Sequence, residues 1–367
     1  MIVKSINLQN YRNYKTLGLR FDPNTNIFYG DNAQGKTNIL EAVYVSGTTK
    51  SHKGAKDKEL IYFSEDEAHI CTIVEKNGMD YKIDMHLRKN KTKGIAINGL
   101  PIRKASELFG IIHFVFFSPE DLSIIKNGPA ERRRFLDVEL CQLDKVYLHQ
   151  LSNYNKLVLQ RNKILKEIHN RSDYQDVLDI LDIQLVQYGT QIVKRRKQFV
   201  SELNEIISKI HSQLSGETEH MVLTYESDIT EKEFSDILRK HREKDLRQKT
   251  TTVGPHRDDL SFLVNEVDIR KFGSQGQQRT AALSLKLSEI ELVKKTIHDT
   301  PILLLDDVLS ELDSHRQNYL LNSIQNIQTM ITCTGLDEFI NHRFSINRVY
   351  KVVDGKVTVE NEQEANG

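Results

Sequence analysis

The chain has 367 residues, enough for one large domain or two ordinary ones, each with its own hydrophobic core. Lysine plus arginine and aspartate plus glutamate both total 51, so a net charge of zero indicates no class of partner. The three cysteines are far apart and form no CxxC pair, which argues against a disulfide framework or a zinc site. The N-terminal residues lack the apolar run of a signal peptide, and no stretch is long and apolar enough to span a membrane. We therefore expect a soluble, cytoplasmic protein without membrane contact.

Short strands are predicted in the first third of the chain. Alternating or short continuous apolar runs mark them, and Asn98–Gly99 is a dipeptide that favours the type I′ turn of a hairpin. The predicted strands begin at Ile2 and continue at 16–21, 26–30, 81–87 and 94–102.

The middle of the chain has a helical pattern. No proline occurs between Pro129 and Leu214, Gly189 is the single glycine there, and apolar residues recur at spacings of three and four. This pattern predicts two long antiparallel helices, separated near 169–176, that form an arm. The basic run at 194–197 is interpreted as the polar face of the arm.

Strand patterns return in the last third of the chain. They occur at 221–225 and 259–264, and a hairpin is predicted around Asp354–Gly355. The polar tail after Glu360 is expected to be disordered. The chain as a whole is expected to be a mixed α/β domain that is split by the helical arm.

A phosphate-binding loop is the most specific motif of the sequence. It matches GxxxxGK[ST] and lies between an apolar strand and a predicted helix, which is the context that the motif requires. Glycines let backbone N–H groups face phosphate oxygens, and the start of the helix adds positive potential. Lys36 is expected to reach the β- and γ-phosphates, and Thr37 to ligate Mg²⁺. The predicted nucleotide-binding residues of this loop are Gly30, Asp31, Asn32, Ala33, Gln34, Gly35, Lys36 and Thr37.

A strand that ends in two acids is predicted to complete the nucleotide site. Four large aliphatic residues, 302–305, have the pattern of a buried parallel strand, and Asp306 and Asp307 follow directly. Because a charged pair is costly in a core, we expect it at the C-terminal end of the strand, facing a ligand. Asp306 would hold Mg²⁺ through water, and Asp307 would polarise the attacking water as a general base. No NKxD motif is present, which disfavours a GTPase.

The segment 272–279, FGSQGQQR, opens a predicted helix. Its amide groups could form an ordinary helix cap or bind an anion, and the residues alone leave both readings open. Followed by the acid strand and by SELD at 310–313, it has the motif order of ABC-type ATPases. Within that superfamily the chain resembles the RecF family of bacterial recombination mediators along nearly its whole length. The motifs that carry the resemblance are LQNYRNY (8–14), GDNAQGKTNILEA (30–42), FSPEDL (117–122), RRRFLD (132–137), GPHRDDL (254–260), GSQGQQR (273–279) and LLLDDVLSELD (303–313).

This resemblance implies an α/β fold: an ABC-type P-loop ATPase head with an inserted helical arm. Residues 1–118 and 251–367 would be the two parts of the ATPase domain, and 119–250 the mainly helical arm. The family's activity would be weak, DNA-stimulated hydrolysis of ATP with Mg²⁺, and ATP would drive formation of a homodimer. The implied partners are double-stranded DNA and the proteins RecR and RecO, which together load RecA at gaps in damaged DNA. The implied processes are DNA repair, recombination, replication and the SOS response.

The resemblance also implies roles for residues outside the P-loop. The signature motif, Ser274, Gly276 and Gln277, would bind the nucleotide of a partner chain. Arg12 and Asn13, just after the first strand, would approach the nucleotide of their own chain. After the acids would follow the D-loop, with Ser310 and Asp313, and the switch position, Thr334.

Three positions depart from the wider ABC pattern. Thr332–Thr334 stands where a switch histidine is usual, with Thr334 as the switch position, and Ser118–Glu120 stands where a glutamine is usual. Asp307 replaces the commoner glutamate and has a shorter side chain. All three departures favour slow turnover.

A basic hairpin is the predicted DNA contact. Between Met85 and Lys104 there are six basic residues and no acidic one, so several would project from one edge and neutralise phosphates. A solvated charged surface is the competing interpretation. A second basic run follows the P-loop helix, a third opens the arm at 132–134, and His256 and Arg257 remain further functional candidates. The DNA-binding candidates are Arg88, Lys89, Lys91, Lys93, Lys53 and Lys56.

Two alternative functions remain. A transporter ATPase subunit would carry a switch histidine and a much shorter insertion between Lys36 and Ser274. A structural DNA-tethering ATPase of the SMC class would carry a far longer arm. The hydrolysis rate, the preferred DNA junction and the partner surfaces do not follow from the sequence.

Overall fold

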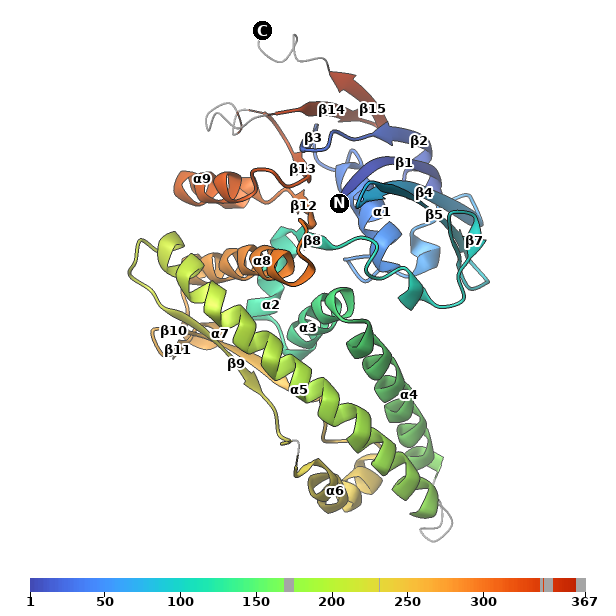
Figure 1. Cartoon of the computed structure of the whole chain (residues 1–367), viewed down its shortest axis with the longest axis vertical. Helices are drawn as coiled ribbons and strands as arrows, with labels where there is room; N and C mark the ends of the chain where they lie inside the picture. The colour runs from blue at the N-terminus through green and yellow to red at the C-terminus, as the bar shows by residue number, and fades with distance from the viewer. Residues whose placement is uncertain (168–174, 231, 337–338, 340–345, 361–367) are drawn as a thin grey trace. The chain divides into compact units, whose positions relative to one another are not determined.

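The structure is a computed structural model of the chain and describes residues 1–167, 175–230, 232–336, 339 and 346–360 (Figure 1). The chain forms two compact units, Met1–Asp121 with Glu289–Gly367, and Leu122–Ser288. Residues 251–288, which we expected in the ATPase domain, therefore pack with the arm in the second unit. The functional division at 118 and 250 stays a prediction. No helix of the described residues is long and apolar enough to cross a membrane.

One layer of the first unit is an antiparallel sheet. The predicted hairpin in it is confirmed, because Asn98 and Gly99 have φ values of 52° and 80°, the left-handed values that a type I′ turn needs. Alternate residues of one strand, Ile83, Met85 and Leu87, are buried in the core, as a period of two predicts. The sheet order is β2-β1-β4-β5-β6-β7, with β1 (Ile2–Tyr11), β2 (Tyr14–Arg20), β4 (Glu67–Lys76), β5 (Met79–Arg88), β6 (Gly94–Ile97) and β7 (Leu100–Pro101).

The other layer of the first unit is a mainly parallel sheet. The acid strand is confirmed as parallel, since β12 (Ile302–Asp306) pairs with β13 (Thr329–Cys333) on one side and β8 (Phe114–Phe117) on the other. Helix α1 (Lys36–Thr48) is buried along nearly its whole length because it contacts strands of both sheets. The order is β15-β14-β3-β13-β12-β8, in which β3 (Thr25–Tyr29) and β14 (Arg348–Val353) are parallel to β13, and β15 (Lys356–Glu360) is antiparallel.

Parallel strands end at the same edge of their sheet. The carboxyl ends of β3, β12 and β13 therefore bring the P-loop and the acid pair together. The predicted hairpin around Asp354–Gly355 is confirmed between β14 and β15, and the tail after Glu360 lies outside the described residues. The remaining elements of this unit are η1 (Asp57–Glu59), η2 (Ala105–Glu107), η3 (Pro119–Asp121), η4 (Leu309–Glu311) and α9 (Ser314–Ser323).

The stretch 129–214 of the arm lies in the second unit, and its described residues form three helices where we predicted two. Its first predicted helix is interrupted at Asp144, whose backbone is extended with φ −137° and ψ 104°. The Asp144 carboxylate accepts the N–H groups of Val146 and Tyr147 at 2.8 and 3.1 Å, so it caps a new helix that the apolar periodicity does not reveal. The helices are α3 (Pro129–Leu143), α4 (Lys145–Glu167) and α5 (Gln175–Leu214); residues 168–174 of the predicted separation lie outside the described residues.

A small sheet completes the second unit. The predicted strands at 221–225 and 259–264 are confirmed as the antiparallel pair β9 (Met221–Glu226) and β10 (Asp259–Val264). Helices α4 and α5 run side by side along this unit (Figure 1). Its other elements are α2 (Leu122–Lys126), α6 (Phe234–Gln248), β11 (Val267–Asp268), α7 (Ile269–Phe272) and α8 (Gln275–Ile297), which continues into the first unit.

The basic run at 194–197 is a polar face only in part: Lys194 and Lys197 are exposed, as predicted, whereas Arg196 is buried. Arg196 is 1% exposed, and its guanidinium donates to Asp137 at 2.6 Å, to the Tyr147 hydroxyl at 2.9 Å and to the Pro255 carbonyl at 2.7 Å. A buried arginine is tolerated only when its donors are satisfied, and these three elements satisfy them. Arg196 therefore fastens α5 to α3, α4 and the segment before β10.

The GPHRDDL segment connects the arm to the small sheet. His256 lies between the Tyr154 hydroxyl at 2.8 Å and the Thr251 carbonyl at 3.0 Å, and burial lowers its pKa to about 4. Arg257 donates to the same carbonyl at 3.0 Å. These contacts give the segment a structural role that the residues alone did not indicate.

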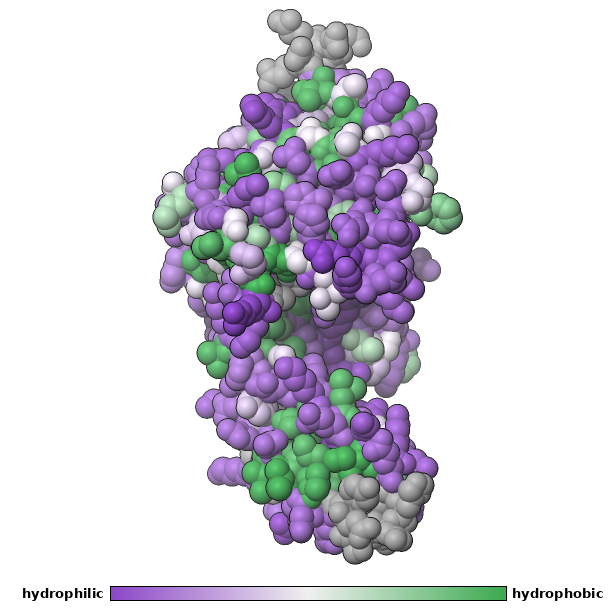
Figure 2. All heavy atoms as spheres, turned by 90° about the vertical axis from the view of Figure 1, so that its right-hand side faces the viewer, coloured by the Kyte–Doolittle hydropathy of each residue, from purple (hydrophilic) through white to green (hydrophobic). Residues whose placement is uncertain are grey.

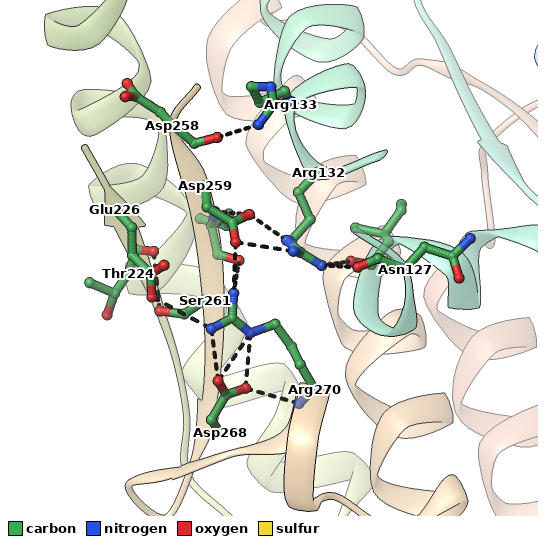
Figure 3. Close-up of polar contacts among 12 residues, drawn as sticks. Asn127, Arg132, Arg133, Thr224, Glu226, Asp258, Asp259, Ser261, Asp268 and Arg270 are labelled. Atoms are coloured by element: carbon green, nitrogen blue, oxygen red, sulfur yellow. Dashed lines mark hydrogen bonds and ion pairs between the residues drawn. The ribbon is translucent and has the colours of Figure 1, made fainter. Parts of the chain in front are cut away.

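Asp259 of the same segment lies between two arginines (Figure 3). It accepts from Arg132 at 2.6 and 3.0 Å and from Arg270 at 3.0 Å, and Arg270 also pairs with Asp268 at 2.7 Å. Arg132 is 4% exposed, and Arg133 donates to the Asp258 carbonyl at 2.7 Å. These two arginines of the run at 132–134 therefore serve internal contacts.

The surface of the helix pair α4 and α5 is not uniformly polar. Figure 2 shows apolar side chains gathered on the lower part of the second unit. Scattered exposed apolar residues are ordinary, whereas a contiguous group is less so. The large exposed apolar residues of these two helices are Val146, Leu159, Val177, Ile180 and Ile183.

Candidate functional site

The P-loop begins where β3 ends and turns directly into α1. Gly30 and Gly35 have φ values of 146° and 109°, which residues with a side chain rarely adopt, so the glycines are needed for the curl of the loop. The helix N-cap is Gly35, and no side chain of the described residues caps the first turn. The N–H groups at the start of the helix and its positive potential suit an anion.

Lys36 lies inside the loop. Its ammonium group donates to the carbonyl oxygens of Gly30 and, at 2.8 Å, Asp31. The side chain is thus folded over the loop at the place where phosphates bind in P-loop proteins. These two carbonyls accept hydrogen bonds from its charged group.

The loop is supported from outside by the turn between β1 and β2. The Tyr14 hydroxyl donates to the Gly35 carbonyl at 3.0 Å, and Asn13 Nδ2 donates to the Gln34 carbonyl at 3.3 Å. Asn13 also accepts from Asn38 of α1 at 2.8 Å. Sequence reasoning placed Asn13 near the nucleotide but missed Tyr14, although Tyr14 closes the same NYRNY motif.

Arg12 is held by a buried acid of α1. Its guanidinium donates to both carboxylate oxygens of Glu41, at 2.7 and 2.8 Å. Burial alone would raise the pKa of Glu41, but hydrogen bonds from Arg12 and from Ser51 outweigh it, and the pKa lies below its ordinary value. Arg12 is therefore fixed beside the P-loop helix as an ion-paired cation.

A groove of about 630 Å³ lies next to this cation. Asn38, in the first turn of α1, and Phe63 both line it. The Phe63 side chain is 98% exposed, which is unusual for an aromatic ring. Polar groups and one flat apolar ring along an open groove suit a nucleoside. The full lining is Arg12, Asn13, Asn38, Lys58, Glu59, Ile61, Phe63 and Lys89.

Asp306 meets the P-loop directly. Its Oδ1 accepts from the Thr37 hydroxyl at 2.8 Å and from the Thr332 hydroxyl at 2.7 Å. Hydroxyl and carboxylate oxygens are the ligands that Mg²⁺ takes from proteins. The donor set therefore fits the predicted metal role of Thr37 and Asp306.

Asp307 has an unusual backbone conformation. Its φ is 53°, in the left-handed region, and its N–H donates to the Thr332 hydroxyl at 3.0 Å and carbonyl at 3.2 Å. Burial raises the pKa of the Asp307 carboxyl above its ordinary value; Ser310 and Lys36 oppose this, and Asp306 adds to it. A strained, partly buried acid beside the P-loop lysine fits the base role predicted for it.

The switch position differs from the residue that touches the acids. Thr334, the predicted position, is exposed after β13, whereas Thr332 within β13 contacts both Asp306 and Asp307. The pairing of Asp306 with Thr332 across the sheet explains this. Aligning the predicted strand at 302–306 with the strand at 329–333 would have placed Thr332 opposite Asp306.

The D-loop residues serve local contacts. Ser310 donates to the Asp307 carbonyl at 2.9 Å, so it steadies the turn that carries the acid. Asp313 is the N-cap of α9 and accepts from the Arg316 N–H at 3.0 Å. Both lie in the first unit with the P-loop.

The signature segment is a helix cap. Ser274 Oγ accepts from the Gln277 N–H at 3.2 Å, and Gln277 Oε1 accepts from the Ser274 N–H at 3.0 Å, which is a reciprocal capping box at the start of α8. Ser274 and Gly276 are exposed. The segment is therefore a helix cap, which was one of its two interpretations, and Ser274 is still accessible to a ligand.

The basic hairpin is partly neutralised by acids. Lys89 pairs with Asp66 at 3.0 Å, and Lys93 pairs with Asp57 at 2.8 Å. The contacts of Arg88 with Glu67 and of Lys53 with Glu120 are longer, 3.9 and 4.0 Å. By contrast, Lys56 and Lys91 are exposed and make no ion pair with a described residue. These two cations are the freest of the six candidates.

A P-loop before a buried helix, followed by a parallel strand that ends in two acids, defines an ATPase head of the SMC-like ABC class. Family comparison agrees, because the RecF/RecN/SMC N-terminal domain matches residues 2–358. The chain belongs to the RecF family.

The relatives are similar along the whole chain. The DNA replication and repair protein RecF of Agathobacter rectalis is 66% identical and that of Lachnospira eligens 61%, with 99% and 98% of this chain and all of each relative covered. A solved structure of the recombination mediator protein RecF with ATP, in the RecFOR pathway, is 36% identical with a TM-score of 0.91, covering 98% of this chain and 97% of that one. An Smc head bound to the C-terminal winged-helix domain of ScpA, at 15% identity and a TM-score of 0.58, covers 100% and 99% and shows the fold alone.

Proposed function

We propose that this chain is a cytoplasmic, ATP-dependent DNA-binding recombination mediator. It binds ATP with Mg²⁺, forms a homodimer on ATP and binds duplex DNA near gaps, where it helps RecR and RecO to load RecA. The observation that carries the ATP part is the contact of Thr37 with Asp306 at 2.8 Å beneath a P-loop whose first helical turn has no side-chain cap. The similarity to a solved structure of the recombination mediator protein RecF with ATP, in the RecFOR pathway, supports the mediator role and the work with RecR and RecO.

The residues of the chain divide the work on ATP. Lys36 leaves the two loop carbonyls and donates to the β- and γ-phosphates, while the N–H groups of the first helical turn bind the other oxygens. Thr37 and Asp306 would hold Mg²⁺, which neutralises charge on the phosphates when bound. Phe63 and Arg12 face the nucleoside along the groove beside α1.

Hydrolysis is expected to be weak and stimulated by DNA. Asp307 polarises the attacking water, and its position is fixed by the Thr332 hydroxyl and by Ser310. An aspartate reaches less far than a glutamate, and no histidine follows β13 at the switch position, Thr334. A slow reaction suits a dimer that must persist on DNA.

The dimer is expected to close through the signature segment. The Ser274 hydroxyl, the Gly276 N–H and the start of α8 at Gln277 would bind the γ-phosphate of ATP held by Lys36 of the partner chain, under two-fold symmetry. Because the γ-phosphate links the chains, ADP is expected to leave the protein monomeric. Ser310 and Asp313 of the D-loop would lie at the same interface.

A mixing experiment tests this arrangement. Lys36→Ala and Ser274→Arg are each expected to fail in ATP-dependent dimerisation, because each homodimer has two defective sites. A mixed dimer has one intact site, so mixing should restore a heterodimer that fluorescence transfer between labelled chains detects. Normal dimerisation of Ser274→Arg alone would contradict binding across the interface.

The DNA surface is expected to involve Lys56 and Lys91, the two exposed cations without an ion pair to a described residue. Replacing Lys56 and Lys91 together with alanine should weaken binding to duplexes of any sequence and reduce the slope of log K against log salt by about 2. The measurement is fluorescence anisotropy with ATP across a salt series. Lys240→Ala with Lys244→Ala on α6 is the matched control for two lost charges. An unchanged slope in the Lys56 and Lys91 variant would remove this surface from the DNA contact.

A further inference from the structure

A chain of hydrogen bonds joins the signature segment to the arm. Gln277 Nε2 donates to Glu219 Oε1 at 2.8 Å, and the other carboxylate oxygen, Oε2, lies 3.1 Å from His211 Nε2. Glu219 lies between α5 and β9, and His211 is a fully buried residue near the end of α5. All three residues belong to the second unit. One carboxylate is therefore shared by the long arm helix and the first turn of α8.

Glu219 determines which way round the Gln277 amide lies. The oxygen of a glutamine amide accepts and its nitrogen donates, although the two ends are nearly the same shape. Since a carboxylate only accepts, the nitrogen faces Glu219 and the oxygen faces the Ser274 N–H, at 3.0 Å. A reversed amide would bring two acceptors together at Glu219 and two donors together at Ser274. Glu219 thus selects the orientation that forms the capping box.

His211 in turn holds Glu219. Ser284 Oγ lies 2.9 Å from His211 Nδ1 and 2.8 Å from the Thr280 carbonyl. Because a carboxylate only accepts, His211 Nε2 donates to Glu219, whose side chain is 20% exposed. Both neighbours of the ring, Glu219 and Ser284, therefore fix its position.

We propose that Glu219, held by His211, is a positioning residue for the signature segment. This rests on the proposed role of Ser274 in binding the partner's ATP. In the capping box Ser274 Oγ accepts from the Gln277 N–H, so its own proton remains to be donated to a phosphate. Without Glu219 the amide turns freely, the Ser274 N–H loses its fixed acceptor, and the hydroxyl is no longer held in one place. The arm and the dimer contact are then coupled through a single side chain.

Glu219→Ala tests the proposal in the full-length protein with a slowly hydrolysed ATP analogue and Mg²⁺. The variant should bind the analogue as the parent does, because the P-loop is in the other unit, and dimerise about tenfold more weakly, the effect of losing one charge-assisted hydrogen bond. Glu219→Gln offers an acceptor oxygen to Gln277 again, and its amide nitrogen can donate to His211 Nε2 when the ring carries its proton on Nδ1, so it should dimerise within about threefold of the parent. Glu217→Ala removes the same charge from the same turn, where Glu217 is exposed, and is the matched control.

Sedimentation gives the dimer constant, titration the nucleotide affinity, and thermal unfolding shows that each variant is folded. The assignment is supported if dimerisation is weakened in Glu219→Ala, recovers in Glu219→Gln and is not weakened in Glu217→Ala. Normal dimerisation of Glu219→Ala, or equal loss in all three variants, overturns it. Ser274→Arg separates the failure of the signature role from the failure of the Glu219 role. If Ser274→Arg dimerises normally, the proposed role of the signature segment is wrong. If Ser274→Arg fails to dimerise while Glu219→Ala dimerises normally, only the role of Glu219 is wrong.

Discussion

Lys36→Ala is expected to weaken ATP binding about 100-fold, because the lysine supplies charge-assisted hydrogen bonds to two phosphates. The ammonium group donates to the carbonyls of Gly30 and Asp31, so it lies within the loop that is proposed to hold the phosphates. Alanine removes the charge and leaves these carbonyls without that donor. Isothermal titration with ATP and Mg²⁺ measures the loss.

Lys50→Ala is the matched control for this prediction. Lys50 is exposed two residues after α1, so its removal changes the net charge equally without touching the loop. It should bind ATP as the parent does. Lys36→Ala should also unfold within a few degrees of the parent, since about 1–2 kcal/mol of polar contacts are lost. An ATP affinity near the parent's in a folded Lys36→Ala protein would remove the P-loop from nucleotide binding.

The parts of the fold that depend on local patterns could be predicted from the sequence. Asn98–Gly99 and Asp354–Gly355 form hairpins because few other residues adopt their left-handed backbone. The run 302–305 becomes a buried parallel strand because it is apolar on both faces. The break at Asp144 was missed because a single capping carboxylate divides a pattern that is otherwise continuous.

The parts that depend on tertiary contacts could not be predicted in the same way. Arg196 looked like a surface residue, and only the meeting of Asp137, Tyr147 and the Pro255 carbonyl makes its burial tolerable. Within the candidate site, the motifs indicated Lys36, Thr37 and Asp306, but the contact of Thr332 with the acids depends on the register of two parallel strands. The Glu219 link to Gln277 joins residues 58 positions apart and has no motif.

Asp307→Asn is expected to lower ATP hydrolysis at least about 100-fold while ATP affinity stays near that of the parent, because the amide cannot take a proton from water. The site tolerates the change sterically, since asparagine has the same shape and also adopts the left-handed backbone found at φ 53°. Burial of the carboxyl, which raises the pKa of Asp307, means that neutralising it removes a desolvation cost. The variant should therefore be folded and at least as stable as the parent.

Phosphate release and ATP titration on the same preparation separate the two effects. The variant should also form a longer-lived ATP-dependent dimer, because hydrolysis is the step that removes the γ-phosphate from between the chains. Asp236→Asn is the matched control: it makes the same chemical change at an exposed acid in the first turn of α6, in the other unit, and it should hydrolyse ATP within about threefold of the parent. Equal hydrolysis by the parent and by Asp307→Asn would exclude Asp307 as the base. The remaining role of its strained backbone would then be to hold the turn between Thr332 and Ser310, and a water positioned by other groups would have to carry the reaction.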